Sequence, residues 1–326
     1  MEGSLKTVGV LTSGGDAPGM NACIRAVVRS ALNRGCRVMG IRKGYAGLLK
    51  GDVMEMNATS VANIIHRGGT ILYTARCPEF LEVEYQDRAA EMCRIFGIDG
   101  LVVIGGDGSF RGAQKLSQRG ISVVGVPGTI DLDVVCSDYT IGFDTAVNVV
   151  VEAVSRLRDT SASHERCSVV EVMGRNCGEI ALWSGIATGA DAIMIPEDAE
   201  SQSFDHLVRV IMENRARGKN HNIIIVAEGV GHAEELAKRI HEVTGIESRA
   251  TILGHIQRGG RPTALDIKHA SMMGYLAVEA LYRGETNRVI SVKDGKYVDQ
   301  DIDEALAMTK EPSLDIWNAN LHISTY

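Results

Sequence analysis

The feature that most constrains the fold of this chain is an alternation of short apolar runs with helical stretches. In the first half, the apolar runs occupy residues 7–12, 36–44, 100–109 and 121–129. Helical patterns over about 20–35 and 86–96 separate them, and further runs follow at 167–174, 191–196 and 222–229. Continuous apolar strands between helices are typical of a parallel sheet covered on both faces. The sequence therefore predicts an α/β protein with two doubly wound lobes and mainly parallel sheets.

The bulk properties limit the classes of protein to which the chain belongs. A length of 326 residues suits two domains, and we expect their boundary near Gly142, without a Pro- or Ser-rich linker. The net charge of −7 argues against a general nucleic-acid binder. Seven cysteines without a C-x-x-C pair argue for reduced thiols rather than disulfides or structural zinc. No signal peptide and no apolar run of about 18 residues is visible, so we expect a cytoplasmic protein without a membrane span.

Two glycine-rich loops follow strand-like runs and precede helical stretches. They are SGGDAPG at 13–19 and GGDGSFRG at 105–112. Glycine lets backbone N–H groups approach a phosphate, and a helix N-terminus adds partial positive charge. Asp107 lies between glycines, where a carboxylate suits Mg²⁺. A tight turn without a ligand is the alternative for either loop, but the pair together favours a polyphosphate site. Neither a Walker sequence nor the G-x-G-x-x-G fingerprint is present.

The segment VPGTIDLD at 126–133 is the candidate catalytic segment. It places Thr129, Asp131 and Asp133 at alternate positions, which point the same way in an extended chain. Phosphoryl transfer to an alcohol needs a base for the hydroxyl proton, and Asp131 is our candidate. An Asp-rich surface turn is the competing interpretation, and it would be favoured if this segment stood alone.

Cationic side chains gather at strand ends in the second half, although the chain is acidic overall. They are Arg166, Arg175, Arg249, His255 and Arg258. Arg binds phosphate with two parallel hydrogen bonds and keeps its proton, so such a set suits a phosphorylated sugar. Glu228, at the end of a strand, is a candidate acceptor for sugar hydroxyls. A surface salt bridge is the alternative role for any one of these arginines.

A further set of basic residues has two equally favoured interpretations. They form either a second anion-binding site, for an effector, or ordinary solvated helix faces. Arg25 and Arg29 share one face of a helix because they are one turn apart. The further candidates are Arg158, Arg217, Lys219 and His221.

Taken together, the motifs resemble the bacterial-type ATP-dependent 6-phosphofructokinase family (phosphofructokinase A) over roughly residues 6 to 310. The resemblance is carried, in the family's order, by TSGGDAPGMN, HRGGT, VVIGGDGS, PGTIDLD, VEVMGR and RATILGHIQRGG. It implies transfer of the ATP γ-phosphoryl group to the 1-hydroxyl of fructose 6-phosphate, with Mg²⁺. It also implies a homotetramer with shared active sites, an ATP-binding lobe of 1–142 plus 257–307, and a sugar-phosphate lobe of 143–256 plus 308–326.

The resemblance also implies a role for each matching residue. ATP would be bound by Gly15, Arg76, Cys77, Gly106, Asp107, Gly108 and Ser109, with Asp107 holding the metal. The sugar would contact Thr129, Ile130, Asp131, Met173, Gly174, Arg175 and Glu228. Asp131 would be the base, and Arg175 would stabilise transition-state charge. His255 and Arg258 would bind the 6-phosphate, and Arg166 and Arg249 would reach across from a neighbouring subunit.

Several positions bear on the donor, on activity and on regulation. Pyrophosphate-using relatives carry Asp and Lys where this chain has Gly108 and Gly128, so ATP is favoured as the donor. Leu132 replaces a usual Asn, which leaves reduced activity or an altered acceptor open. Ala58, Asn220 and Asp191 depart from the family's effector residues, so regulation by ADP or phosphoenolpyruvate is doubtful. The competing hypotheses are a pyrophosphate-dependent or altered-acceptor enzyme and a catalytically weak regulatory paralogue.

Overall fold

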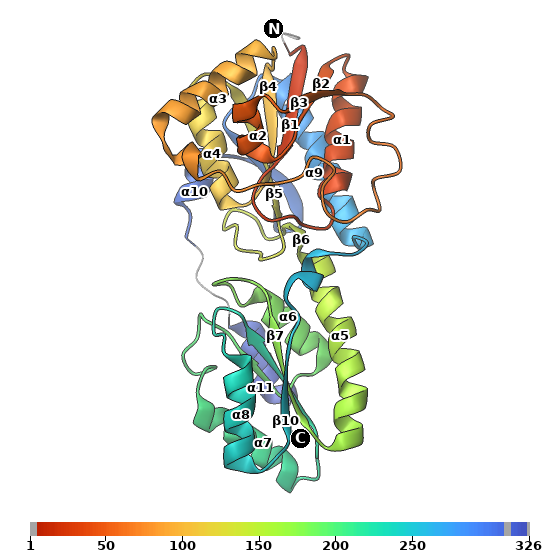
Figure 1. The fold of residues 1–326 in the computed structure, drawn as a ribbon, viewed down its shortest axis with the longest axis vertical. Helices are drawn as coiled ribbons and strands as arrows, with labels where there is room; N and C mark the ends of the chain where they lie inside the picture. The colour runs from red at the N-terminus through yellow and green to blue at the C-terminus, as the bar shows by residue number, and fades with distance from the viewer. Residues whose placement is uncertain (1–4, 310–313, 325–326) are drawn as a thin grey trace. The chain divides into compact units, whose positions relative to one another are not determined.

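The computed structural model describes residues 5–309 and 314–324, and these form two compact units. The first unit contains the described residues of 1–145 and 258–310, and the second those of 146–257 and 311–326. The chain therefore passes from one unit to the other more than once. Figure 1 shows that each unit is a sheet with helices on both faces.

The first unit is built on an eight-stranded sheet in the order β12-β11-β5-β4-β1-β2-β3, with β6 paired to β5. Its outermost strands, β3 and β12, are antiparallel to their neighbours, and the other pairs are parallel. The strands are β1 (Thr7–Thr12), β2 (Arg37–Ile41), β3 (Val53–Met56), β4 (Gly100–Gly105), β5 (Ser122–Thr129), β6 (Ile141–Gly142), β11 (Arg288–Lys293) and β12 (Lys296–Asp301).

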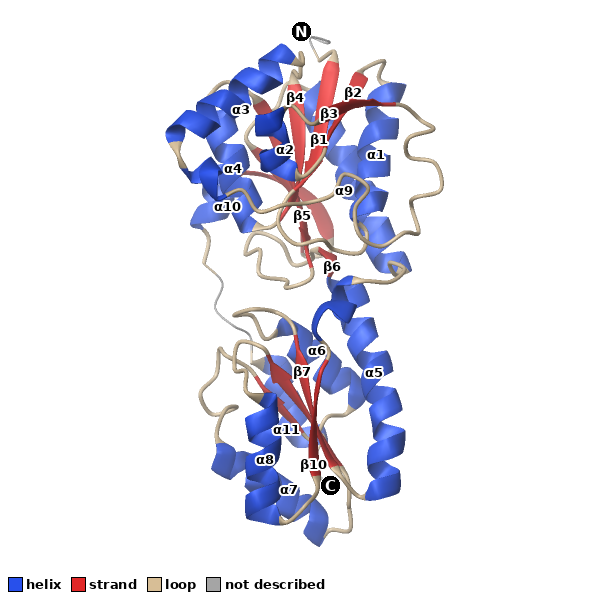
Figure 2. Ribbon diagram, in the orientation of Figure 1, coloured by secondary structure: helices blue, strands red, loops and turns tan. Residues whose placement is uncertain are grey.

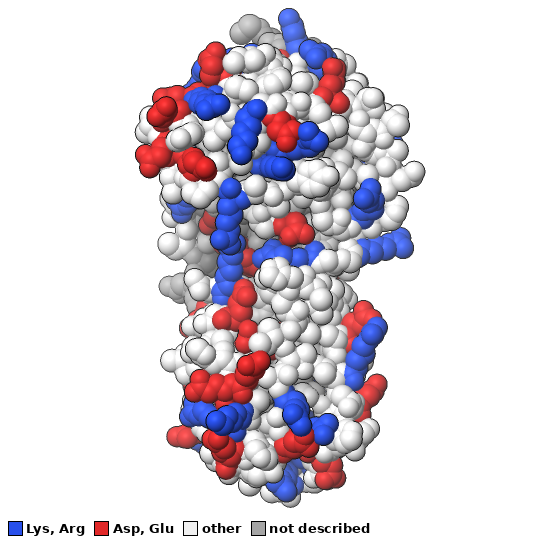
Figure 3. Space-filling view, viewed as in Figure 1, with Lys and Arg blue, Asp and Glu red and all other residues white. Residues whose placement is uncertain are grey.

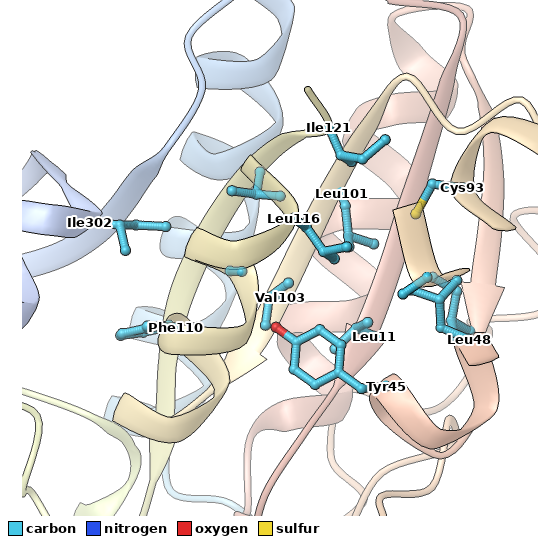
Figure 4. Packing of buried hydrophobic residues seen from close by; sticks show 14 of the residues in the cluster. Leu11, Tyr45, Leu48, Cys93, Leu101, Val103, Phe110, Leu116, Ile121 and Ile302 are labelled. Carbon is cyan, nitrogen blue, oxygen red and sulfur yellow. The ribbon is translucent and has the colours of Figure 1, made fainter. Parts of the chain in front are cut away.

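Helices cover both faces of this sheet (Figure 2). One face carries α1 (Met20–Asn33) and α9 (Ala264–Tyr282). The other face carries α2 (Gly44–Lys50), α3 (Val83–Ile95), α4 (Asp107–Ser117) and α10 (Ile302–Ala307), while the short helix η1 (Pro78–Leu81) precedes α3. The core beneath this second layer is mainly aliphatic, with Phe110 and Leu116 of α4 packed near Leu101 and Val103 of β4 (Figure 4). Burial of such side chains contributes about 1.5–3 kcal/mol each.

The second unit has a four-stranded sheet, fully parallel, in the order β10-β7-β9-β8. The strands are β7 (Cys167–Val172), β8 (Ala192–Met194), β9 (Asn222–Ala227) and β10 (Ser248–Ile252). The helices are α5 (Phe143–His164), α6 (Glu179–Thr188), α7 (Phe204–Ala216), α8 (Ala233–Thr244), α11 (Asp315–Ile323) and the short η2 (Gly254–Arg258). Figure 1 shows α7 and α8 on one face of this sheet and α5, α6 and α11 on the other.

The predicted fold class is confirmed, with corrections to individual elements. Two predicted strands end early, because Gly44 begins α2 and Asp107 begins α4. The sequence analysis did not predict β3, β6, β10, β11 or β12. The extended conformation expected over 129–133 is wrong: β5 ends at Thr129, and Leu132 has φ of +54°, which turns the chain.

On the face shown in Figure 3, Lys and Arg are interspersed with Asp and Glu over both units. Among the described helices, none combines the length and apolar character that a bilayer crossing requires.

Candidate active site

The two glycine loops lie side by side at the carboxyl edge of the large sheet. They follow β1 and β4, which are adjacent parallel strands with Thr12 opposite Ile104. The strand order reverses at this pair, since β2 lies beyond β1 and β5 lies beyond β4. Open α/β sheets bind ligands at such a switch point, outside the carboxyl ends of the strands. The loops touch: the Ser13 amide donates to the Ile104 carbonyl at 2.9 Å, and a Cβ on Gly105 would lie 2.5 Å from the Ser13 carbonyl oxygen.

The second loop presents a helix N-terminus to the same edge. Gly106 is the N-cap of α4, Asp107 is its first residue, and Ser109 lies in its first turn. A ligand phosphate would therefore meet free backbone N–H groups and the positive end of the helix dipole. The sites of a Cβ on Gly106 and Gly108 are nearly open, since only Thr129 lies within 4 Å of the first and nothing lies within 4 Å of the second.

The segment that carries Arg76 and Cys77 runs beside the first glycine loop. The Thr74 hydroxyl donates to the Gly14 carbonyl at 2.6 Å, and the Thr12 hydroxyl donates to the Tyr73 carbonyl at 2.8 Å. These bonds fix the chain just before Arg76, whose side chain is exposed.

Asp107 and Asp133 form an acidic pair in this unit. Burial raises the pKa of the Asp107 carboxyl, and the negative charge of Asp133 raises it further, while Arg111 lowers it in part. A divalent cation would relieve this repulsion, and Mg²⁺ usually takes one or two protein carboxylates plus phosphate oxygens. The residues present therefore fit such an ion, although the described residues contain no cluster of three or more metal-binding side chains.

Asp131 lies at the carboxyl end of β5, buried to 2% exposure. Its backbone N–H donates to the Thr129 hydroxyl at 3.1 Å, which closes a tight turn after the strand. Arg258 lies nearby, with 3.9 Å between its Nη2 and the Asp131 Oδ1. The same guanidinium donates to the Asp16 carbonyl at 3.1 Å.

Gly15 makes this position of Arg258 possible. A Cβ on Gly15 would lie 2.6 Å from the Arg258 Nη1. The first unit thus brings together Gly15, Gly106 to Ser109, Thr129 to Asp131, and Arg258.

The space beside Gly128 corrects one part of the sequence argument. A Cβ there would lie 3.0 Å from Ile104 and 3.3 Å from Met20, so side chains of the core fill that space. Of the two glycines used to argue for ATP, Gly108 has open space beside it and Gly128 does not.

In the second unit, the predicted acceptor residues at the carboxyl edge of the small sheet form a compact turn after β7. Gly174 has φ of +137° and Arg175 has φ of +55°. The Glu228 carboxylate, after β9, accepts the backbone N–H groups of both, at 3.1 and 2.5 Å. Gln257 accepts the Met173 N–H at 3.2 Å, which links this turn to the η2 segment that contains the exposed His255.

Arg166 and Arg249 lie at the opposite edge of that sheet from Met173 to Arg175, and Arg166 directly precedes a strand, as the sequence analysis expected. Arg166 precedes β7, and Arg249 is the second residue of β10. Both guanidinium groups pair with Glu247, at 2.9 and 2.8 Å. These two arginines lower the pKa of the Glu247 carboxyl through hydrogen bonds and charge. The sequence analysis missed Glu247, although an acid two residues before Arg249 was a visible signal.

The predicted effector residues are divided between the units. Arg25 and Arg29 lie on α1 in the first unit, and the others lie in the second unit. Asp191 is buried and accepts hydrogen bonds from Asn214 and from the Ile223 N–H, both at 2.8 Å, and from Lys219. Arg158 donates to the Thr188 carbonyl, at the end of α6. Burial lowers the pKa of His221, and the charges of Lys219 and Arg158 lower it further.

Glycine loops and a helix N-terminus at the carboxyl edge of a parallel sheet are the architecture of α/β proteins that bind phosphates. The family sequence model described as Phosphofructokinase matches residues 7–281. The ATP-dependent 6-phosphofructokinase of Clostridium acetobutylicum is 60% identical over 314 residues, which are 96% of this chain and 98% of that protein. A Clostridium botulinum protein of the same name is 58% identical over the same shares. The chain belongs to the phosphofructokinase family.

Solved structures show the same fold. The phosphofructokinase of Pichia pastoris in the T-state matches with a TM-score of 0.89 and 39% identity, over 99% of this chain and 37% of that chain. That of Saccharomyces cerevisiae matches with a TM-score of 0.86 and 36% identity, over 92% of this chain and 44% of that chain. This chain thus spans less than half of each yeast chain. A pyrophosphate-dependent phosphofructokinase from Marinobacter aquaeolei has the same fold at 21% identity and a TM-score of 0.86, so the fold does not identify the phosphoryl donor.

Proposed function

We propose that this chain transfers the γ-phosphoryl group of ATP to the 1-hydroxyl of fructose 6-phosphate, as a glycolytic kinase of the cytoplasm. The observation that carries the proposal is the meeting of both glycine loops with Asp131 at one edge of the large sheet. The relatives that are 58–60% identical over nearly the whole chain, and are named ATP-dependent 6-phosphofructokinase, support the choice of substrates.

In the proposed mechanism the first unit positions the donor. The N–H groups of the loops around Gly15 and Gly106 to Ser109 bind the phosphates, and Arg76 and Cys77 contact the nucleotide. Asp107, with Asp133 beside it, would hold Mg²⁺, whose charge would offset that of the phosphate oxygens. The open space beside Gly108 supports a nucleotide rather than pyrophosphate as the donor.

Asp131 accepts the proton of the acceptor hydroxyl as that oxygen attacks phosphorus. The Thr129 hydroxyl, bonded to the Asp131 N–H, holds the turn on which the carboxylate sits. A carboxylate placed in this way accounts for a factor of roughly 10²–10⁴ in turnover. Thr129 and Ile130 also contact the sugar, and Arg175 stabilises the charge that develops on the transferred group.

The other acceptor contacts come from the turn Met173 to Arg175, from Glu228 and from His255. Because both Gly174 and Arg175 have positive φ and are held by Glu228, this turn is fixed before the sugar binds. Arg258 and His255 bind the 6-phosphate. The positive charge of Arg258 also partly offsets the negative charge of Asp131.

The position of Arg166 and Arg249 supports active sites shared between subunits of a homotetramer. These arginines and the turn at Met173 to Arg175 lie at opposite edges of one parallel sheet, and β7 between them has six residues. At about 3.3 Å per residue, the two edges are roughly 17–20 Å apart. A single protomer cannot set both groups against one sugar phosphate, so Arg166 and Arg249 would serve the site of a neighbouring copy.

The test is a coupled assay with fructose 6-phosphate as acceptor, run with MgATP and with magnesium pyrophosphate. We expect turnover with ATP and at most trace turnover with pyrophosphate, and the reverse pattern would contradict the assigned donor. Omission of Mg²⁺ should abolish turnover. Addition of ADP or phosphoenolpyruvate tests the effector residues. We expect weak regulation, because Asp191 already bonds to partners within its own unit.

A further inference from the structure

Asp266 is a fully buried carboxylate that the proposed mechanism does not use. It is the third residue of α9 and is 0% exposed. Its Oδ1 accepts hydrogen bonds from the Tyr139 hydroxyl and the Gly142 N–H, both at 2.6 Å. Its Oδ2 accepts the N–H and the hydroxyl of Thr145, at 2.9 and 2.5 Å. All these donors lie within 139–145, where β6 ends and α5 begins.

Gly142 connects this carboxylate to the candidate active site. It belongs to β6 and pairs with Thr129, at the end of β5. Its φ is +106°, and a Cβ there would lie 2.7 Å from the Ala17 Cβ and 3.2 Å from the Ile130 Cγ2. The backbone at Gly142 is therefore packed against both the first glycine loop and the catalytic segment. A shift of Gly142 would be transmitted to both.

The bonding pattern requires a carboxylate at position 266. Burial raises the pKa of Asp266, and the hydrogen bonds from Thr145, Tyr139 and Gly142 oppose that rise. Asparagine, an amide of the same size, has only one acceptor oxygen. Its NH₂ group would take the place of the other oxygen and would face the N–H or O–H donors that bond to that oxygen. Buried donors left without a partner are costly, so the segment 139–145 would move to find other acceptors.

We propose that Asp266 is a positioning residue for phosphoryl transfer, which holds Gly142 and thereby keeps the Thr129–Asp131 turn in its reactive place. The proposal rests on the proposed role of Asp131 as the base. It differs from simple helix capping because it predicts a loss of turnover beyond the loss of stability.

Asp301 offers a matched control within the same unit. It caps α10 and accepts the N–H groups of Asp303 and Glu304, at 2.8 and 3.3 Å, and an Asn287 side-chain N–H at 3.2 Å. Asp301→Asn therefore also replaces a capping carboxylate by an amide, but one that bonds to Asn287 and the start of α10 rather than to residues 139–145.

The first test compares kcat, both KM values and the Tm of Asp266→Asn and Asp301→Asn. We expect Asp266→Asn to lower kcat by about 10–100-fold, since a displacement of about 1 Å at a reacting group has an effect of this size. The KM values should change by less than kcat does. Asp301→Asn should keep kcat within about twofold, as expected for a surface cap away from the site. Equal kcat values for the two variants would overturn the proposal.

A second pair of variants keeps the test valid if Asp266→Asn does not fold. Thr145→Val removes one donor to Asp266, and also the acceptor of the Thr263 N–H, with little change of shape. Thr145→Ser retains the hydroxyl and both of these bonds. We expect Thr145→Val to lose turnover and Thr145→Ser to retain it. Amide hydrogen exchange of the peptide over 128–142, measured without substrates, should be faster in Thr145→Val and unchanged in Asp301→Asn.

The exchange measurement also separates failure of this proposal from failure of the assigned base. Faster exchange together with unimpaired turnover of Asp131→Ala would keep Asp266 as the residue that fixes this segment and would remove Asp131 from its role. Unchanged exchange in Thr145→Val, with turnover equal to that of Thr145→Ser, would overturn the positioning role of Asp266.

Discussion

At the scale of single residues, the candidate site contains carboxylates that are buried or close to another negative charge. Asp131 is buried at the end of a strand, and Asp107 shares its surroundings with Asp133. Such arrangements persist where function requires them, because burial without ligands disfavours ionised groups. Two predictions follow from these two residues.

Replacement of Asp131 by Ala should lower kcat by roughly 10²–10⁴, the usual effect of losing a general base. Binding of fructose 6-phosphate should largely persist, because the proposed phosphate contacts are on residues other than Asp131. Steady-state kinetics together with equilibrium binding of the sugar phosphate measure both quantities. A variant with unaltered turnover would exclude Asp131 as the base.

Replacement of Asp107 by Asn should abolish most activity and yet stabilise the ligand-free protein. The raised pKa of Asp107 means that the folded chain binds its proton more tightly than the unfolded chain does. The carboxyl therefore disfavours folding at pH 7, and this effect disappears as the pH falls through the raised pKa. We expect the Tm of Asp107→Asn at pH 7 to exceed that of the wild type by about 1–4 °C, the shift produced by about 1 kcal/mol.

Differential scanning fluorimetry with and without Mg²⁺ measures this effect. Mg²⁺ should raise the Tm of the wild type more than that of Asp107→Asn, because binding to the folded state stabilises it. A variant that is less stable than the wild type at pH 7, with the same response to Mg²⁺, would contradict the assignment of the metal to Asp107.

At the scale of elements, the candidate site forms where two adjacent parallel strands end at the same edge of the sheet. The glycine loops meet because β1 and β4 are neighbours in parallel register, and Gly105 has no room for a side chain. A Cβ there would lie 2.3 Å from the Ser109 Oγ and 2.5 Å from the Ser13 carbonyl oxygen. The second of these contacts is with backbone, which cannot rotate away.

We therefore expect Gly105→Ala to separate the two loops and to raise the KM for ATP by at least about tenfold, which corresponds to about 1.4 kcal/mol of lost binding. Its control is Gly100→Ala at the other end of β4, where the Cβ would meet Leu side chains at 3.0 Å. Overpacking of this kind costs typically 1–3 kcal/mol, so both variants should have a lower Tm. A similar KM for ATP in both variants would show that the loops act independently.

The alternation of elements was predictable, because buried parallel strands produce long apolar runs that local sequence reveals. The elements that were missed lack this signal. β6 has only two residues, and β12 is a polar strand, KYVDQD, on the edge of the sheet. The turn at Leu132 was not predictable either, since Leu rarely takes a positive φ, although its side chain is buried in the structure.

The candidate site was predictable as a set of residue types but not as a geometry. Sequence motifs identified Gly15, Asp107 and Asp131, because each follows an apolar run. They did not show that Arg249 lies near the start of a strand, because the sequence analysis did not predict β10. They also gave no sign of Asp266, whose partners lie more than 120 residues earlier in the chain.

At the scale of the whole molecule, the separation of the two edges of the small sheet predicts that one chain cannot complete its own active site. If its guanidinium binds the phosphate in the ground state as proposed, Arg249→Ala should raise the half-saturating concentration of fructose 6-phosphate more than it lowers kcat. The opposite pattern would contradict a phosphate contact. This result alone does not show which subunit supplies the arginine.

Subunit complementation identifies the source of that arginine. Arg249→Ala chains retain Asp131, and Asp131→Ala chains retain Arg249. If a site combines Asp131 of one chain with Arg249 of a neighbour, hybrids refolded from an equal mixture will contain intact sites. Random assembly in closed symmetric oligomers makes about a quarter of the sites intact. The hybrids should therefore regain about a quarter of wild-type activity at a sugar-phosphate concentration where both parents are nearly inactive.

The control mixes Asp131→Ala with Asp107→Ala, because both residues belong to the first unit of one chain. No intact site can arise from that pair when one chain supplies both residues, so its activity should stay at the level of the parents. Recovery in the control would mean that the first unit itself is divided between subunits. Failure of the Arg249→Ala and Asp131→Ala pair to recover, with hybrid formation verified by native mass spectrometry, would assign both residues to the same chain and contradict the shared site.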